Sequence, residues 1–193
     1  MATYEDGRIR KLAAQLARAG IEQRLVDQIM AGGDEVSRTT KPEIKAAWFR
    51  GAMERMDELI DQPTRQAVRE GCACCLGGKR DAISRSIARQ HATIEERVAA
   101  ANAARFVFGH GVSWTDDGRI LVKFAPEGQA SYRCVCLPKS ELPISDTYCY
   151  CCAGHAKHHL QTALGRKLAV QVRSSALSSS GARPCTFLFS LAD

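Results

Sequence analysis

Cysteine is the residue type whose number and spacing most clearly indicate chemistry in this chain. All nine cysteines follow residue 71, and eight of them fall in three close-set groups at 72–75, 134–136 and 149–152. The first group contains Cys-x-x-Cys between glycines, and the other two contain Cys-x-Cys. In a reducing compartment such groups are typical of metal ligands or reactive thiols rather than of a disulfide framework.

A thiolate-bound metal is the first interpretation of these groups. Close cysteine pairs joined by a loop can enclose a tetrahedral ion through sulfur, and residues i and i+2 of an extended segment present both side chains to one side. We expect zinc, with an iron–sulfur cluster as the alternative, because thiolates bind both. The candidate metal ligands are Cys72, Cys75, Cys134, Cys136, Cys149 and Cys151.

Two other interpretations of the cysteines remain open. Free cysteine is often buried as a small apolar side chain, which suits Cys185 at the start of an alternating apolar run. A redox disulfide or a reactive thiol is the other interpretation of the eight clustered cysteines.

Three histidines after the last cysteine group indicate a second kind of site. His155, His158 and His159 lie at positions i, i+3 and i+4 of an expected helix, so His155 and His159 share a face, with Cys152 one turn earlier. The candidate catalytic residues are therefore Cys152, His155 and His159, either as ligands of an ion with an open position or as an activated thiol. Solvated histidines on a helix surface are the alternative.

Composition excludes several classes of protein. The chain has 193 residues, of which 45% are hydrophobic and 25% charged, which is typical of a globular protein. No segment approaches the ~18 apolar residues needed to cross a bilayer. The first residues include acidic side chains and no apolar run, unlike a secretory signal. We expect a cytoplasmic protein without membrane attachment.

The charge distribution does not favour a nucleic-acid partner. Residues 1–71 carry 12 basic and 12 acidic side chains, so the whole net charge of +6 falls in the cysteine-rich part. Metal-bound thiolates would offset such a charge locally, since four around one Zn²⁺ leave about −2. No run of lysine and arginine exceeds two residues, unlike a nucleic-acid-binding zinc module.

Helical periodicity dominates the first half of the chain. Two short helices end near Gly20 and at the glycine pair 32–33, and a third begins after Thr40 and runs to Pro63. Thr40 with Glu43 predicts a capping box, and Ile44 is expected to face the core. Further helices are expected at 64–70, 79–90 and 93–106, the last opened by a capping box of Thr93 with Glu96.

The second half changes to strand periodicity. A hairpin is expected around an Asp-Gly turn at 117–118, then a turn at 126–129 and a third strand through Tyr132 and Val135. A helix at 152–164 precedes two more alternating strands. The prediction is an α+β fold, in which an antiparallel sheet of about five strands carries helices on one face after an all-helical N-terminal region. We divide the chain at 1–71 and 72–193, and leave homodimer formation open.

The C-terminal part resembles the 4-vinyl reductase-type domain. The matching residues are Tyr-Cys-Tyr-Cys-Cys-Ala-Gly-His from 148, Leu-Gly-Arg at 164–166, the strand from Leu168, a Ser/Gly turn and Pro-Cys-Thr-Phe-Leu-Phe from 184. Related cysteine-rich bacterial and archaeal proteins, some labelled L-2-amino-thiazoline-4-carboxylic acid hydrolase-like, pair such an end with an earlier Cys-x-x-Cys. The resemblance covers Cys149 to the C-terminus, extends in part from Cys72 and is absent before it. It implies an α+β small-molecule-binding module.

Phenol-sensing members of that family hold zinc through three cysteines and a glutamate. Alignment through Gly165 places two of the cysteines at Cys149 and Cys185, the third at Ser175 and the glutamate at Val172. Valine and serine cannot supply the missing carboxylate and thiolate, so this resemblance does not carry that zinc site over. A metal in this chain would need Cys134, Cys136, Cys151 or the 72–75 group.

These observations lead to three functional hypotheses. The first is a cytoplasmic sensor or binding protein, in which a thiolate-bound metal organises a pocket for a small-molecule ligand between the sheet and its helices. The second is a metal- or cysteine-dependent hydrolase of a small molecule, and enzyme activity is left undecided. The third, a nucleic-acid-binding zinc module, has only the net charge in its favour.

Overall fold

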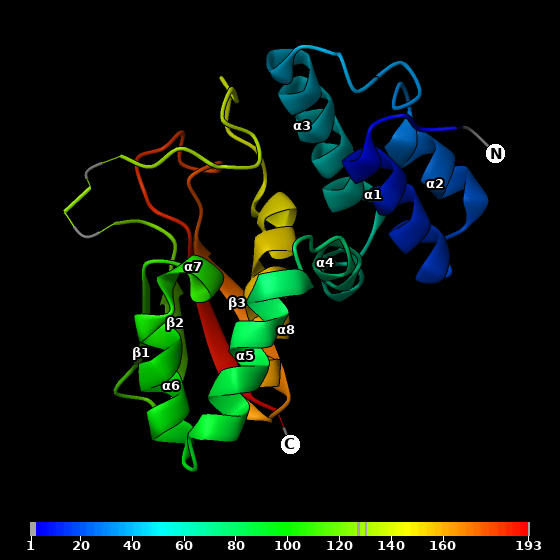
Figure 1. The fold of residues 1–193 in the computed structure, drawn as a ribbon. Coiled ribbons are helices and arrows are strands. Elements are labelled where there is room, and N and C mark those ends of the chain that lie inside the picture. Colours follow the sequence, from blue (N-terminus) through cyan, green and yellow to red (C-terminus); the bar gives the residue numbers. More distant parts are fainter. Residues whose placement is uncertain (1–2, 127, 130, 193) are drawn as a thin grey trace.

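The computed structural model describes residues 3–126, 128–129 and 131–192. Within them the fold is α+β, with an N-terminal helical region followed by one antiparallel sheet and its helices (Figure 1). The N-terminal helices are α1 (Gly7–Arg18), α2 (Gln23–Met30), α3 (Pro42–Leu59) and α4 (Gln62–Gly71). The remaining elements are α5 (Gly78–Gln90), α6 (Ile94–Ala103), α7 (Arg105–Phe108), β1 (Gly111–Trp114), β2 (Ile120–Lys123), the 3₁₀ helix η1 (Asp146–Cys149), α8 (Tyr150–Leu164), β3 (Leu168–Ser174) and β4 (Thr186–Leu191).

The sheet has four strands in the order β1-β2-β4-β3, all antiparallel, and not the expected five. The segment predicted as an additional strand is a loop. Tyr132 makes one backbone hydrogen bond, donated to the carbonyl of Gly181, and Val135 is 75% exposed. A single bond to another loop cannot build a ladder. The expected turn at 126–129 includes Glu127, which lies outside the described residues.

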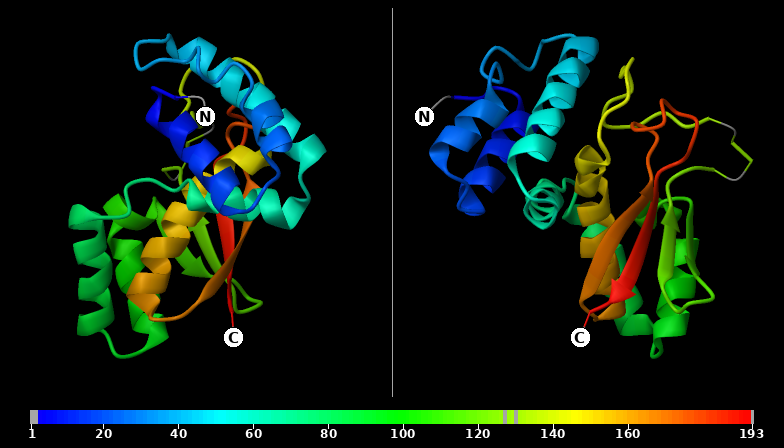
Figure 2. Two further views of the ribbon diagram at one scale, coloured as in Figure 1. Left: turned by 90° about the vertical axis from the view of Figure 1, so that its right-hand side faces the viewer. Right: turned by 180° about the vertical axis from the view of Figure 1, so that it is seen from behind.

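The helices α5, α6 and α8 lie on one face of the four-stranded sheet, which includes β3 and β4 (Figure 2). Phe187 and Phe189 of β4, Leu160 of α8 and Phe108 of α7 are fully buried between these layers. The sequence predicts a ligand pocket at this interface, where the buried side chains just named are apolar. Its role is to fix α8, which carries two of the cysteines.

Local sequence explains most helix boundaries. Thr93 and Glu96 form the predicted capping box at the start of α6. The other predicted box is wrong, because α3 begins after Lys41 without a side-chain cap, and the Thr40 hydroxyl accepts a hydrogen bond from the Ser37 amide instead. Ile44 was expected in the core and is 54% exposed.

Helix α4 connects the two parts of the molecule. It lies between the N-terminal helices and α8 in Figure 1 and in the right-hand view of Figure 2, and it contacts α1, α3 and α8. A Cβ at Gly154 of α8 would lie 2.4 Å from the carbonyl oxygen of Glu70. This close approach places the end of α4, and the 72–75 loop that follows it, beside the start of α8. No helix in the described ranges is long and apolar enough to cross a membrane.

Candidate functional site

A cavity of about 330 Å³ lies where the N-terminal helices contact the cysteine-bearing segments. Four cysteines from three parts of the chain line it, namely Cys72, Cys74, Cys136 and Cys151. The rest of its wall is Asp6, Gly7, Arg8 and Lys11 of the α1 end, Phe49 of α3, Arg69 of α4 and Tyr148 of η1. We call this space the cysteine cavity. It brings together members of all three cysteine groups that the sequence singled out.

The thiol of Cys136 is the centre of a cluster of four sulfurs. It lies close enough to the thiols of Cys134, Cys151 and Cys152 for each of them to shift its pKa, and Cys151 and Cys152 are close enough to shift the pKa of each other. We call these four residues the thiol cluster. Two of them, Cys136 and Cys151, also form part of the cavity wall. The cluster is therefore reached through the cysteine cavity.

Hydrogen bonding within the cluster separates the acidities of its thiols. The hydrogen bond from Cys136 lowers the pKa of Cys134, and the backbone N–H groups of Leu137 and Cys136 lower it further. Cys134 raises the pKa of Cys136, but hydrogen bonds from Cys151 and Cys152 outweigh this and the pKa of Cys136 is lowered. Negative charge in the cluster is therefore favoured on the 134–136 segment.

The thiols on α8 and in the 72–75 loop behave in the opposite way. The hydrogen bonds that Cys151 and Cys152 make to Cys136 raise the pKa of both thiols. Burial raises the pKa of Cys72, and it raises that of Cys74 to about 11. At neutral pH these thiols are uncharged and contribute no negative charge to the cavity.

Arg69 supplies a buried positive charge to the cysteine cavity. Its residue exposure is 3%, one Nη donates to the carbonyl of Tyr148 at 3.1 Å, and its Nε has no hydrogen-bond partner among the described residues. The guanidinium carbon lies 4.6 Å from the centre of the Tyr148 ring. Burial disfavours the charge of Arg69, but its pKa is still raised, because the cysteines and Tyr148 around it ionise at high pH before the guanidinium could lose its proton. Arg69 is therefore charged at neutral pH.

Two further cations reach the cavity from α1. Arg8 donates to the carbonyl of Cys136 at 2.6 Å, and Lys11 donates to the carbonyl of Ala73. The one acid of the lining, Asp6, is already engaged, because it accepts the Arg8 amide as N-cap and pairs with Lys45 at 3.2 Å. The cavity is consequently cationic.

Cys149 and Cys185 lie in a separate buried site. Their thiols are hydrogen-bonded, and the Cys149 sulfur is 2.9 Å from the hydroxyl oxygen of Ser175. The Ala176 amide donates to the Cys185 sulfur at 3.3 Å. Cys149 therefore does not join Cys151, although the sequence placed both in one ligand set. The reason is that residues 149 and 151 lie in helical turns, where positions i and i+2 point in different directions.

The histidines of α8 hold the 72–75 loop. His155 Nδ1 is 3.0 Å from the carbonyl oxygen of Cys74, and its Nε2 is 3.2 Å from that of Val107. His159 Nε2 donates to the carbonyl of Cys75 at 3.1 Å, while its Nδ1 lies 3.1 Å from the Ser84 hydroxyl. Cys75 itself is exposed, with φ at 60°, an uncommon conformation outside glycine. A neutral His155 can donate to only one of its two carbonyl neighbours, so these contacts orient both rings towards the backbone of the 72–75 loop and α7.

The metal site expected from the sequence finds no support in ligand geometry. In the described ranges, no group of three or more histidine, cysteine, aspartate or glutamate side chains is arranged to hold a metal ion. The four sulfurs of the cysteine cavity have the right chemistry for a soft ion, but they are not arranged around one point. Zinc and an iron–sulfur cluster therefore stay predictions.

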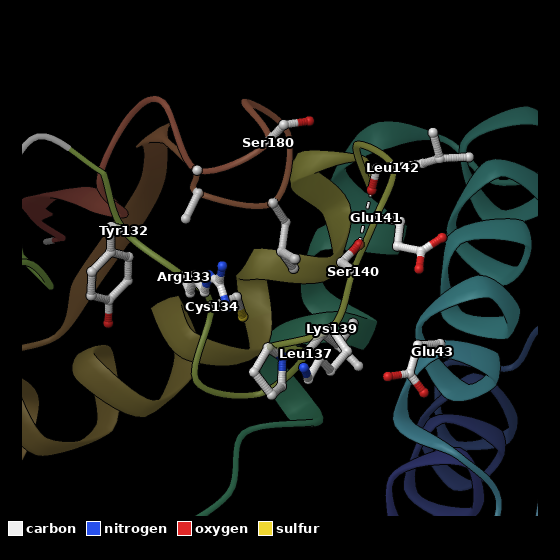
Figure 3. A pocket seen from close by; sticks show the side chains of 14 residues that line it. Glu43, Tyr132, Arg133, Cys134, Leu137, Lys139, Ser140, Glu141, Leu142 and Ser180 are labelled. Carbon is white, nitrogen blue, oxygen red and sulfur yellow. Dashed lines mark hydrogen bonds between the residues drawn. The ribbon is translucent and has the colours of Figure 1, made fainter.

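A second cavity, of about 380 Å³, lies between α3 and the loops at 132–142 and 176–181. Figure 3 shows Glu43 of α3 on one side, and Tyr132, Arg133 and Cys134 of the loop on the other. Its charged residues have both signs, since Lys139 and Glu141 also line it. It lacks the concentration of thiols and positive charge that distinguishes the cysteine cavity, so we take the latter as the candidate site.

Comparison with protein families covers almost the whole chain. The model described as "Family of unknown function (DUF6144)" matches residues 9–186. The chain belongs to this family. The match spans both the N-terminal helices and the sheet, and it includes every lining residue of the cysteine cavity except Asp6, Gly7 and Arg8. No curated protein matches the sequence.

Sequence reasoning missed the charged half of this DUF6144 site. Arg69 stands three residues before Cys72, near the end of a helix, and nothing in its spacing indicates burial. Arg8 and Lys11 lie on the exposed side of an amphipathic helix pattern and resemble solvated charges. Cys74 was passed over in favour of Cys75 because Cys-x-x-Cys is the more familiar ligand spacing. One sequence signal could have indicated the charged residues of the site: a basic residue, Arg69, lies close to a cysteine group.

Proposed function

We propose that this protein binds a small anionic molecule in the cysteine cavity, as a binding or sensor protein. The observation that carries the proposal is the burial of Arg69 without an acidic partner in the described ranges 3–126, 128–129 and 131–192. Buried charges in proteins are paired or bound to a ligand, because an isolated ion is costly to remove from water. A ligand anion would complete this pairing.

The other charges of the cavity support an anion rather than a cation or a neutral molecule. Arg8 and Lys11 add positive charge, and Asp6 is neutralised by its helix cap and Lys45. Cys72 and Cys151 lie close to Arg69, but their pKa values are raised, so they are not anions at neutral pH. The volume of about 330 Å³ falls in the range of small-molecule sites.

Calorimetric titration of the full chain tests this proposal. The probes are inorganic sulfate, citrate and glutathione sulfonate, which span a range of sizes and share negative charge. We expect at least one to bind wild-type protein, with affinity that falls as salt is raised. The Arg69→Met variant should lose binding by about tenfold or more, since the main buried charge is gone. Absence of binding by all three probes, or equal binding by the variant, would overturn the proposal.

A thiolate-bound metal is the second candidate, favoured by the convergence of four cysteines on one cavity. The positive side chains would then offset the charge of a metal–thiolate group. Metal analysis and an absorption spectrum of protein purified without oxygen test it. A stoichiometric amount of zinc or iron that is lost in Cys136→Ser and kept in His155→Ala is the expected result. Purified protein that folds without metal would exclude this candidate.

A further inference from the structure

We propose that Cys136 and Cys151 form a dithiol that reduces an anionic low-molecular-weight disulfide bound in the cysteine cavity. This inference rests on the proposed anion binding and names a substrate class for the same site. Three features carry it: the shared position of both thiols in the wall of one cavity, the cations around them and the proximity by which each thiol acts on the other.

The position of Cys136 suits it to attack a bound disulfide. It is partly exposed, lines the cavity and lies in a loop outside regular secondary structure. The Arg8 side chain bonds to the carbonyl of the same residue at 2.6 Å, so a ligand anion held by that cation lies beside the thiol. The thiolate is the attacking form in thiol–disulfide exchange.

Cys151 is placed to complete the reaction. It lines the same cavity as Cys136, its thiol is close enough to that of Cys136 for the two to interact, and it lies in the first turn of α8. The contact of α4 with Gly154 holds that turn in position. Cys152 also interacts with Cys136 but does not line the cavity, so we do not assign it to the reacting pair.

The reaction balances in two steps. The Cys136 thiolate attacks one sulfur of the disulfide R–S–S–R, the R–S–S–R bond breaks, and one RS⁻ leaves and takes a proton from water. Cys151 sulfur then attacks the Cys136 sulfur of the mixed disulfide. A bond forms between Cys136 and Cys151, and the second RSH leaves with the Cys151 proton. Overall the protein dithiol loses two electrons and two protons, and the disulfide becomes two thiols.

The positive charges predict which disulfides react fastest. Arg8, Lys11 and Arg69 attract negatively charged ligands to the cavity. Glutathione disulfide carries net negative charge, whereas 2-hydroxyethyl disulfide is neutral. Electrostatic attraction of this kind raises association rates by about tenfold or more at low salt and is screened as salt rises. We compare the rate of each disulfide with the protein to its rate with a simple free thiol. This ratio should be higher for the anionic disulfide than for the neutral one, and the difference should shrink in high salt.

Mass spectrometry of trapped intermediates tests the assignment of both cysteines. Full-length reduced protein is mixed with glutathione disulfide without oxygen, and the reaction is stopped with acid. Wild-type protein should release two equivalents of glutathione and gain a Cys136–Cys151 disulfide. Cys151→Ser should accumulate one glutathione on Cys136. Cys136→Ser should lower the release rate by about tenfold or more, because the attacking thiolate is absent.

Cys75→Ser is the matched control, since it removes an exposed thiol of the 72–75 loop that does not line the cavity. It should change the rate by less than about twofold. Adducts on Cys74 or Cys75 in place of Cys136, or no adduct in Cys151→Ser, would overturn the proposal. Tightly bound stoichiometric metal would also overturn it.

Glutathione sulfonate separates this inference from the proposed function on which it rests. It has the charge of the substrate half but no disulfide bond. If the protein binds the sulfonate but does not react with glutathione disulfide, only the assignment of Cys136 and Cys151 as a reactive dithiol is wrong. If none of the three anionic probes binds, the proposed anion site is wrong, whatever the rate of thiol–disulfide exchange.

Discussion

A buried guanidinium that has a carbonyl and an aromatic ring for partners, and no carboxylate, is costly to the folded protein. As far as the described part of the chain shows its partners, Arg69 is in this position. Replacing buried charged groups by apolar side chains of similar length is often neutral or stabilising by about 1–4 kcal/mol. We therefore expect Arg69→Met to leave the free energy of unfolding unchanged or to raise it by about 1 kcal/mol. Urea unfolding of the ligand-free protein measures this.

The matched control is Arg55→Met, because Arg55 donates three hydrogen bonds to the carbonyls of Ile29 and Ala31. That change should destabilise the protein by about 1–3 kcal/mol through unsatisfied carbonyls. Arg69→Met losing more stability than Arg55→Met would show that Arg69 is a structural residue. It would then give no reason to place an anion beside it.

The ring of His159 gives the protein a pH-dependent stability. The ring is fully buried, and burial lowers its pKa from 6.5 to about 4. The unfolded chain takes up a proton as the pH falls through 6.5, while the folded protein does so only near 4. The free energy of unfolding should therefore fall between these pH values, by at most about 1.4 kcal/mol per pH unit from this group.

His159→Gln should reduce that slope, as measured by urea unfolding at several pH values from 4 to 7. His110→Gln, at an exposed histidine, is the control and should keep the wild-type slope. Equal slopes in wild-type protein and His159→Gln would mean that other groups carry the pH dependence. His155 is the first of these, because burial lowers its pKa too.

The cysteines show how far residue types and spacing could lead. Their convergence was predictable, since segments 72–75, 134–136 and 149–152 all contribute to one cavity or cluster. The partners of single cysteines were not, because Cys-x-Cys has a defined direction only when the backbone conformation is known. Cys134 and Cys136 lie in a loop and not in the expected strand, whereas Cys149 and Cys151 lie in helical turns and separate.

At the level of elements, the contact between α4 and α8 determines the geometry of the cavity. Helix α4 carries Arg69 and leads into Cys72, and α8 begins with Cys151. Gly154→Ala would place a methyl group 2.4 Å from the Glu70 carbonyl oxygen, so the helices must separate. We expect a loss of about 1–3 kcal/mol in unfolding free energy, as for overpacked cores. Slower reaction of Cys136 with glutathione disulfide should accompany it.

Gly51→Ala is the same substitution on α3, where the added methyl group meets the flexible end of Arg55 at 3.1 Å. Alanine favours helix over glycine by about 0.5–1 kcal/mol, so this variant should be neutral or slightly more stable. If Gly154→Ala behaved like Gly51→Ala, the close approach of α4 and α8 would not control the site.

Element prediction succeeded where the pattern is local and failed where pairing is distant. The hairpin of β1 and β2, the strands β3 and β4 and the capping box of Thr93 follow from alternation and turn residues. The segment through Tyr132 alternates in the same way but pairs with no strand in the described part of the chain. Alternation specifies two faces of a segment, and only the tertiary structure decides whether a neighbouring strand exists.

At the scale of the whole molecule, the site depends on two regions that the sequence treated separately. The N-terminal helices contribute Arg8, Lys11 and Phe49, and the cysteines come from residues 72 onward. Division at residue 71 followed the change in composition and periodicity, neither of which reports contacts between regions. The helical half, which contains no cysteine, thus supplies the cations that give the cavity its charge.

Two side chains of α1 connect these regions at the cavity. Arg8 bonds to the Cys136 carbonyl and Lys11 to the Ala73 carbonyl. Arg8→Ala with Lys11→Ala removes both bonds and leaves the α1 core residues Ile9 and Leu12 in place. Hydrogen bonds to charged groups contribute about 1.5–3 kcal/mol each, less where solvent reaches them. The double variant should therefore allow the 72–75 and 134–137 segments to open more often while α1 remains folded.

Hydrogen exchange followed by mass spectrometry measures this opening. Exchange in both cysteine segments should rise by about tenfold or more in the double variant, which corresponds to about 1.4 kcal/mol, with little change in β3 and β4. Arg10→Ala with Arg18→Ala, two exposed residues on the same helix, is the charge-matched control. The two lost bonds join α1 to the cysteine segments. If hydrogen exchange rose only in α1, then α1 would cover the cavity without ordering those segments. If hydrogen exchange rose only in the cysteine segments, then α1 would be the element that orders the thiols.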